Sequence, residues 1–241
     1  MVRTLVLVVA LLGACVADDS TEPGDHEEVS DFDPVPADGK ADGVPTTFNQ
    51  NNVVDDALFT GDMEVADVQE FLDHSPYGNR SWLATYTVDG VSAAQKIVDA
   101  ARAEHIHPLM LLVRMQVEAS LVSKTVTPSQ SRINAALGCG CPDGGGCSAS
   151  YRGLSAQLTC GAHTLRRWFD GSQDRTGEWK MGSARRTLDP RTVTPANHAT
   201  ASLYSYTPWV LVGRGGNWLV WNISKKYVRH AEANGLIPAT P

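Results

Sequence analysis

Apolar residues recur at helical spacing along most of the chain, and they predict a mainly α fold. The segments with this spacing are 62–72, 92–101, 108–122, 154–169, 195–204 and 217–232. In the first of them Asp62 can cap a helix whose Val65, Val68 and Phe71 fall on one face. Alternation with a period of two residues is scarce, and only residues 207–213 predict a strand.

Two of the predicted helices begin at specific signals. Ser92 is followed three residues later by Gln95, which is a capping-box pattern, and Pro108 suits the first turn of a helix. The segment that begins at Pro108 is apolar almost all round, which is typical of a central, buried helix. Its polar members are Arg114, Gln116, Glu118 and Ser120.

The N-terminus predicts export. Arg3 precedes an apolar run over residues 5–12, which is too short to span a bilayer core of about 30 Å. Leu-Gly-Ala lies directly before Cys15 and fits a lipobox, so we interpret residues 1–14 as a signal peptide and Cys15 as a lipid anchor. The alternative is plain secretion without lipidation. We therefore expect a protein of the cell envelope, anchored on the periplasmic or extracellular face of a membrane, or secreted.

Charge divides the rest of the chain into a tether and a domain. Residues 18–43 hold ten carboxylates and one lysine, and such a composition cannot bury a core. We interpret 15–45 as an acidic disordered tether and 46–241 as one domain, large enough for a real core. Residues 102–241 hold sixteen Lys and Arg against eight acids. Such a basic surface suits an anionic polymer like the bacterial cell wall and equally nucleic acid, and solvated surface arginines are the further alternative.

Four cysteines remain in the predicted domain, and an even number in an exported chain predicts two disulfides. Three pairings are possible. We predict Cys141–Cys147, which closes a short turn, and Cys139–Cys160, which ties this loop to the following helix. A zinc site is the alternative, although the spacing C-x-C-x5-C lacks the usual C-x2-4-C pairs.

Glu118 is the candidate for chemistry. It lies in the last turns of the apolar helix, where a carboxylate among aliphatic side chains is disfavoured in its charged form. A general acid that protonates a glycosidic oxygen needs this property. The alternatives are an ion pair with Arg114, four residues earlier, or a carboxylate hydrogen-bonded at a seam of the domain.

The segment 107–122 resembles the catalytic helix of the lysozyme-like superfamily, in the pattern of goose-type lysozymes and soluble lytic transglycosylases. Those enzymes carry a glutamate at the end of an apolar helix and often a serine two residues later, as Glu118 and Ser120 here. Residues 153–157, Gly-Leu-Ser-Ala-Gln, are similar to the Gly-Leu-Met-Gln element that lines the glycan cleft, with one extra residue before the glutamine. Residues 201–208, Ala-Ser-Leu-Tyr-Ser-Tyr-Thr-Pro, stand in the place of the later tyrosine motif that helps to position the glutamate.

The resemblance spans residues 63–230 and implies a lysozyme-like helical domain that cleaves the β-1,4 bond between N-acetylmuramic acid and N-acetylglucosamine. A two-carboxylate hydrolase needs a second acid at a set separation, and no later acid stands in an obvious position. The later acids that we considered are Asp143, Asp170, Asp174 and Glu178. The resemblance to lytic transglycosylases then implies that Glu118 alone protonates the leaving oxygen. It next acts as base on the sugar's 6-hydroxyl, which gives a 1,6-anhydro product.

Other residues are expected to contact the substrate. Ser120, Gln157 and Tyr204 follow from the resemblance, and Tyr151 and Tyr206 are our choices among the aromatic residues for stacking on sugar rings.

The expected partners are the glycan strands of peptidoglycan and, through Cys15, a membrane. We expect no nucleic-acid partner, a monomeric protein and no cofactor. His105 and His107 have no further ligand at metal spacing, so we expect no metal either. A glucosaminidase that cuts the other β-1,4 bond is one alternative function. A non-catalytic envelope protein that binds glycan or a protein partner is another.

Overall fold

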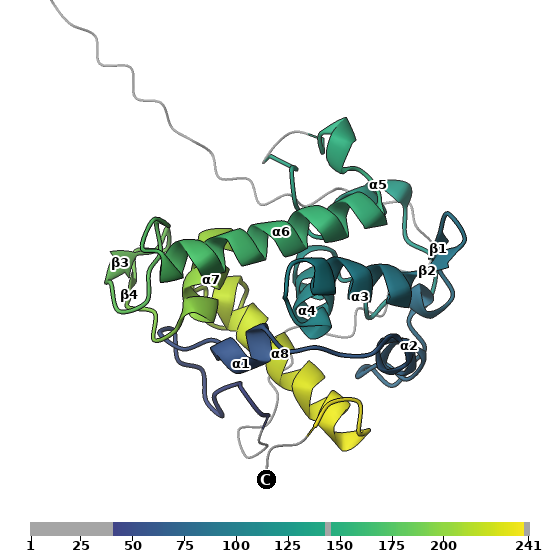
Figure 1. The fold of residues 1–241 in the computed structure, drawn as a ribbon, viewed down its shortest axis with the longest axis horizontal. Helices are drawn as coiled ribbons and strands as arrows, with labels where there is room; N and C mark the ends of the chain where they lie inside the picture. Colours follow the sequence, from purple (N-terminus) through teal and green to yellow (C-terminus); the bar gives the residue numbers. More distant parts are fainter. Residues whose placement is uncertain (1–40, 143–145, 239–241) are drawn as a thin grey trace, which may run out of the picture.

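The computed structural model describes residues 41–142 and 146–238 (Figure 1). The predicted signal peptide, Cys15, most of the tether and Asp143 lie outside the described residues. Within the described ranges, no helix has the length and apolar character needed to cross a membrane.

The domain begins earlier than we predicted. Residues 41–45 were assigned to the tether, but Ala41 and Val44 are buried. The amide of Asp42 donates a hydrogen bond to the carboxylate of Glu232 at 2.8 Å. These contacts attach the segment to the last helix of the domain.

The described chain is mainly helical, as predicted. Its α-helices are α1 (Asp56–Phe59), α2 (Val65–Asp73), α3 (Ala93–Ala103), α4 (Pro108–Ala119), α5 (Gln130–Asn134), α6 (Leu154–Gln173), α7 (His198–Tyr206) and α8 (Gly216–Ala233). Two 3₁₀ helices are η1 (Trp82–Ala84) and η2 (Ala149–Tyr151). Two short antiparallel hairpins pair β1 (Thr87–Val88) with β2 (Val91–Ser92), and β3 (Arg185–Arg186) with β4 (Thr192–Val193).

The apolar helix α4 lies at the centre of the domain, as its all-round hydrophobicity predicts. It packs against α3 and α8, while the long helix α6 crosses one side of the molecule and packs along α7 (Figure 1). Pro108 occupies the first turn of α4, and the Nδ1 atom of His107 caps the helix by accepting from the amide of Leu109 at 3.0 Å. Ten of the twelve residues of α4 are buried, so a charged side chain on this helix requires a partner.

Several predicted helix ends move by a few residues. Ser92 caps α3 as predicted, with its Oγ accepting from the amide of Gln95 at 3.2 Å. Helix α4 ends three residues before the predicted Val122, because Ser120 adopts the left-handed conformation with φ 49°. This early end places Glu118 in the last turn of α4. At the other boundary, α6 continues four residues beyond the predicted Phe169.

Two predicted helix starts are wrong by two or three residues. Helix α2 begins after Glu64 rather than after Asp62, whose carboxylate binds Arg102 at 3.0 Å. Helix α7 begins after Asn197, whose side chain accepts from the amide of Thr200 at 2.8 Å.

The predicted strand 207–213 does not form. The carboxylate of Asp189 accepts hydrogen bonds from the amides of Val210 and Leu211, both at 2.9 Å. Leu211 also has a positive φ of 45°, which is incompatible with an extended strand. The alternation in the sequence therefore marks a turn held by a distant carboxylate.

Both predicted disulfides are confirmed. Cys139 is bonded to Cys160 on α6, and Cys141 to Cys147 within the loop. The cysteines are therefore not available as zinc ligands.

Candidate functional site

Glu118 presents a partly exposed carboxylate at the end of α4. Its side chain is 29% exposed, whereas most of the helix is buried. An anion in the last turn of a helix opposes the helix dipole, which costs about 0.3–1 kcal/mol when it is unpaired. A carboxylate in this place is therefore expected to have a charged partner, a role in function, or both.

The carboxylate is paired with Arg114, the partner that the i,i+4 spacing predicted. The Nη2 atom of Arg114 donates both to the carboxylate of Glu118 and to the Oγ1 of Thr207, the latter at 3.0 Å. The Arg114 side chain is only 1% exposed, and its Cζ lies 4.1 Å from the centre of the Tyr206 ring. This stacking is a cation–π contact in a desolvated place.

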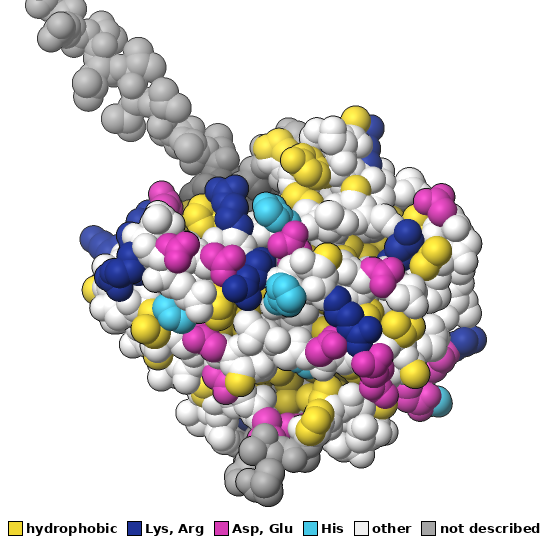
Figure 2. Space-filling model, in the orientation of Figure 1, with side chains coloured by type: hydrophobic (Ala, Val, Ile, Leu, Met, Phe, Trp, Pro, Cys, Tyr) yellow, Lys and Arg dark blue, Asp and Glu magenta, His cyan; other side chains and the backbone are white. Residues whose placement is uncertain are grey.

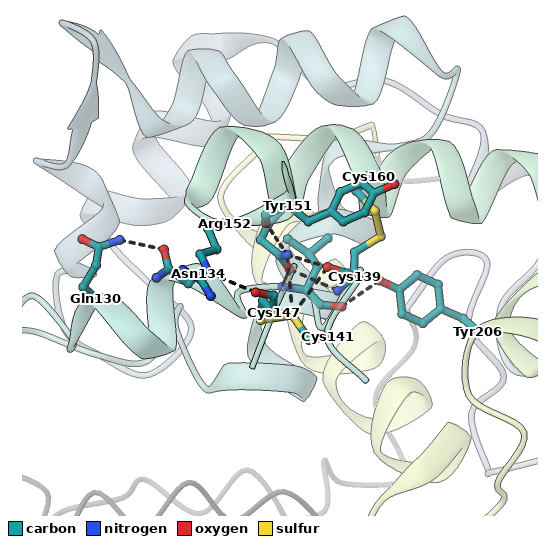
Figure 3. Close-up of a disulfide and its surroundings, with 11 residues drawn as sticks. Gln130, Asn134, Cys139, Cys141, Cys147, Tyr151, Arg152, Cys160 and Tyr206 are labelled. Carbon is teal, nitrogen blue, oxygen red and sulfur yellow. Dashed lines mark hydrogen bonds between the residues drawn. A yellow bond between two sulfur atoms is a disulfide. The ribbon is translucent and has the colours of Figure 1, made fainter. Parts of the chain in front are cut away.

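Tyr206 joins the ion pair to the loop that follows α5. Its hydroxyl donates to the carbonyl oxygen of Leu137 at 2.7 Å, and Figure 3 shows the ring reaching across to the loop that carries Cys139. Burial raises the pKa of Tyr206 to about 12, an effect that Arg114 opposes and Glu118 reinforces. The hydroxyl is therefore a neutral donor at any physiological pH.

A glycine lets this loop approach the carboxylate. Gly138 has φ 69°, and a Cβ built on it would lie 3.2 Å from Oε2 of Glu118. A side chain at this position would strain the backbone and crowd the carboxylate. We call Arg114, Glu118, Gly138, Tyr206 and Thr207 the Glu118 site.

Gln157 stabilises the same loop through side-chain hydrogen bonds. Its Oε1 accepts from the amides of Leu137 and Cys139, at 3.0 and 3.1 Å. Its Nε2 donates to the carbonyl oxygens of Cys139 and Tyr151, both at 2.7 Å. The side chain is fully buried, so Gln157 offers no surface to a substrate and acts as a support of the loop.

The other predicted contact residues fall in three different places. Tyr151 lies on η2, 41% exposed, with its ring packed so closely on Gly140 that no side chain would fit there. Ser120 ends α4 two residues from Glu118 and is half-buried. Tyr204, in contrast, is fully buried, and its ring stacks on Trp179 at 4.9 Å. Burial raises the pKa of Tyr204 well above its usual range. Tyr204 is therefore a core residue without surface for a ligand.

Two acids of the basic segment have arginine partners of their own. Asp170, on α6, pairs with Arg166 at 2.6 Å, and Glu178 pairs with Arg185 at 3.1 Å.

One end of the molecule carries several exposed basic residues. Figure 2 shows dark-blue Lys and Arg side chains over the end that carries the β3–β4 hairpin, with acidic ones between them. Arg186 and Arg191 on this hairpin are exposed.

Within the described residues, no group of three or more His, Cys, Asp or Glu could hold a metal ion.

Some residues of the site were missed by the sequence interpretation. Thr207 directly follows Tyr206 in the tyrosine motif, so the motif could have indicated Thr207 as a site residue. Gly138 precedes the first cysteine of the loop, and no local pattern distinguishes it from the other glycines there.

No match to this chain was found among family models, curated proteins or solved structures.

Proposed function

We propose that this protein cleaves the glycan strands of peptidoglycan, at the β-1,4 bond between N-acetylmuramic acid and N-acetylglucosamine, with Glu118 as its single acid and base. The observation that carries the proposal is a partly exposed carboxylate at the end of a buried helix, set against a glycine of a braced loop. Proton transfer to a bound sugar requires such a fixed carboxylate. The resemblance of residues 107–122 to the catalytic helix of lysozyme-like enzymes supports the same role.

The ion pairs of the other acids support the single-glutamate route. A hydrolase that works with two carboxylates needs them within about 10 Å of each other. Asp170 and Glu178 are each engaged by an arginine. In the route proposed, Glu118 protonates the leaving glycosidic oxygen as the bond from that oxygen to the anomeric carbon breaks. The resulting carboxylate then removes the proton of the sugar's 6-hydroxyl, whose oxygen bonds to the anomeric carbon.

The cellular setting of the proposal comes from the N-terminus. A lipobox-like sequence before Cys15 and an acidic tether would hold the domain at the cell envelope, within reach of the wall. The basic end would then face an anionic polymer.

The test is a digestion of purified peptidoglycan with residues 16–241, which lack the anchor cysteine and retain the buried Ala41 and Val44. Wild type, Glu118→Gln and the matched control Asp170→Asn are compared, because Asp170 also pairs with an arginine four residues earlier on a helix. Products are identified by mass spectrometry between about pH 4.5 and 7.5, where a carboxyl acid should titrate.

Anhydro-muropeptides from wild type and Asp170→Asn, but not from Glu118→Gln, would support the proposal. Reducing-end sugars would instead identify a hydrolase, and the terminal sugar would show whether a muramidase or a glucosaminidase bond is cut. No release of products at any pH would contradict the enzymatic proposal.

A non-catalytic envelope protein is the second candidate, and the ion pair favours it. Arg114 satisfies Glu118 without any substrate, so the carboxylate has a structural use. This candidate predicts that wild type and Glu118→Gln sediment equally with peptidoglycan and that neither releases fragments.

A further inference from the structure

Arg114 is an energetically unfavourable residue for its buried position on α4. Its neighbours on α4 include Val113 and Met115, both buried, and an aliphatic residue at position 114 would continue the pattern. Burying a guanidinium is unfavourable unless it is paired and hydrogen-bonded. Its Nε and Nη1 have no hydrogen-bond partner among the described residues. The side chain therefore directs its bonds through Nη2 toward Glu118 and Thr207.

The guanidinium is held from two sides. The Tyr206 ring covers one face at 4.1 Å, and Thr207 accepts a hydrogen bond at 3.0 Å. Both residues lie at the end of α7, which packs on α6. A fixed guanidinium in turn fixes the carboxylate that it binds, because the rotamer freedom of both side chains is already lost.

Few charged or titratable groups face the carboxylate. Arg114 comes from its own helix, and Tyr206 from α7 is neutral because burial raises its pKa to about 12. Arg132 from α5 approaches the carbonyl oxygen of Ala119 at 3.4 Å. The loop 137–139 adds a leucine, a glycine and a disulfide-bonded cysteine, which carry no charge. Arg114 is thus the cation in direct contact with Glu118.

We propose that Arg114 is the positioning residue of the Glu118 site. It holds the carboxylate in one orientation next to Gly138. This role rests on the proposed function, in which the ionised carboxylate is the base and its protonated form the acid.

The test compares Arg114→Met and Arg114→Lys with the matched control Arg166→Met. Arg166 also pairs with a carboxylate four residues later and lies over an aromatic ring, at 5.0 Å from Phe169, but it is not part of the Glu118 site. Arg114→Met should lower kcat about 10- to 100-fold, the cost of a misplaced catalytic group, with a much smaller change in KM. Arg114→Lys should recover part of the loss, and Arg166→Met should match wild type.

Recovery of kcat in Arg114→Lys separates positioning from mere stability, because a cation at the same place restores the contact with the carboxylate. Should Arg114→Met fail to fold, Thr207→Val is the deciding variant, because it leaves the ion pair and removes one hydrogen-bond partner of the guanidinium. Thr207→Val should lower kcat several-fold. The role would be overturned if kcat of Arg114→Met equalled that of Arg166→Met. It would also be overturned if Arg114→Met did not fold and Thr207→Val kept the kcat of wild type.

A labelling experiment distinguishes failure of this role from failure of the proposed function. Water-soluble carbodiimide reacts with accessible carboxyl groups, and the partly exposed Glu118 can be followed by peptide mass spectrometry. Arg114→Met should be labelled at Glu118 several-fold faster than wild type, because the guanidinium no longer covers and holds the carboxylate, whether or not any glycan is cleaved. Equal labelling rates would contradict the positioning role, even in an active enzyme.

Discussion

The hydroxyl of Tyr206 donates a hydrogen bond to the carbonyl oxygen of Leu137 at 2.7 Å across 69 positions of sequence. The ring of the same tyrosine covers Arg114. The Tyr206 side chain thus links the loop that contacts Glu118 to the guanidinium that binds Glu118. The relative placement of loop and carboxylate depends on this link.

Tyr206→Phe should therefore affect activity more than stability. It removes one hydrogen bond, which is worth about 1 kcal/mol, and keeps the ring over Arg114. The freed loop should lower kcat several-fold. The control is Tyr77→Phe, which loses a hydroxyl contact with Tyr227 elsewhere in the fold. Equal kcat values in the two variants, measured beside their thermal unfolding, would show that the link does not serve the site.

Gln157→Leu should destabilise the domain strongly. It leaves the amides of Leu137 and Cys139 and two carbonyl oxygens without their partner. Each buried group left unsatisfied costs about 1–3 kcal/mol, so we expect a loss of at least about 3 kcal/mol in urea unfolding. Gln130→Leu is the control, because Gln130 makes an exposed bond to Asn134. A loss no larger than in the control would mean that water replaces the Gln157 amide.

Local features of the site and fold could be predicted from the sequence. The pair Arg114–Glu118 follows from the spacing of one helical turn, and the cap at Ser92 from a short motif. The two disulfides followed from the cysteine spacing and the loop between them. Each of these depends on residues close in sequence, or on a short list of possible pairings.

The tertiary contacts could not be predicted. Gln157 was expected to face a glycan, but three of its four hydrogen bonds go to a loop about twenty residues earlier, and the fourth goes to Tyr151. Tyr204 and Tyr206 belong to one motif, yet two residues along a helix point in directions about 200° apart, so one lies in the core and the other at the site. The turn at Val210 was taken for a strand, because the carboxylate of Asp189 that holds it is remote in sequence.

The two disulfides should differ in their contribution to stability. Cys139 and Cys160 close a loop of 21 positions, whereas Cys141 and Cys147 close one of 6. Loop-closure entropy predicts about 3 kcal/mol for the first and about 2 kcal/mol for the second. The double variants Cys139→Ala/Cys160→Ala and Cys141→Ala/Cys147→Ala, compared by chemical unfolding, check the order. The first should also lower activity more, since Cys139 is in the loop at Glu118.

His107 should make the domain less stable in acid. Burial lowers its pKa from 6.5 to about 4, against an opposing effect of Asp62. The unfolded chain therefore binds a proton between these pH values that the folded chain does not, and stability falls as pH falls from 6.5 to about 4. The full loss is about 3 kcal/mol. His107→Asn keeps a capping side chain and should flatten this part of the profile in thermal melts. The exposed His74→Asn should leave it unchanged; a profile of His107→Asn equal to that of wild type would contradict the assignment.

The ion pair at the site makes a prediction about stability that is independent of any activity. Glu118→Gln leaves the buried Arg114 without a counter-charge, which costs about 3 kcal/mol for a buried pair, at the low end because water reaches position 118. Adding Arg114→Met should restore most of this loss, since the double variant buries no charge. Arg114→Met alone should cost less than Glu118→Gln, because the remaining carboxylate is partly solvated. A double-mutant cycle by urea unfolding gives the coupling between the two residues, and Asp170→Asn measures the effect of an exposed pair, expected below about 1 kcal/mol. If Glu118→Gln is no more destabilising than Asp170→Asn, the Arg114 guanidinium has another partner in the folded domain. The free-energy cost of burying Arg114 then does not depend on Glu118.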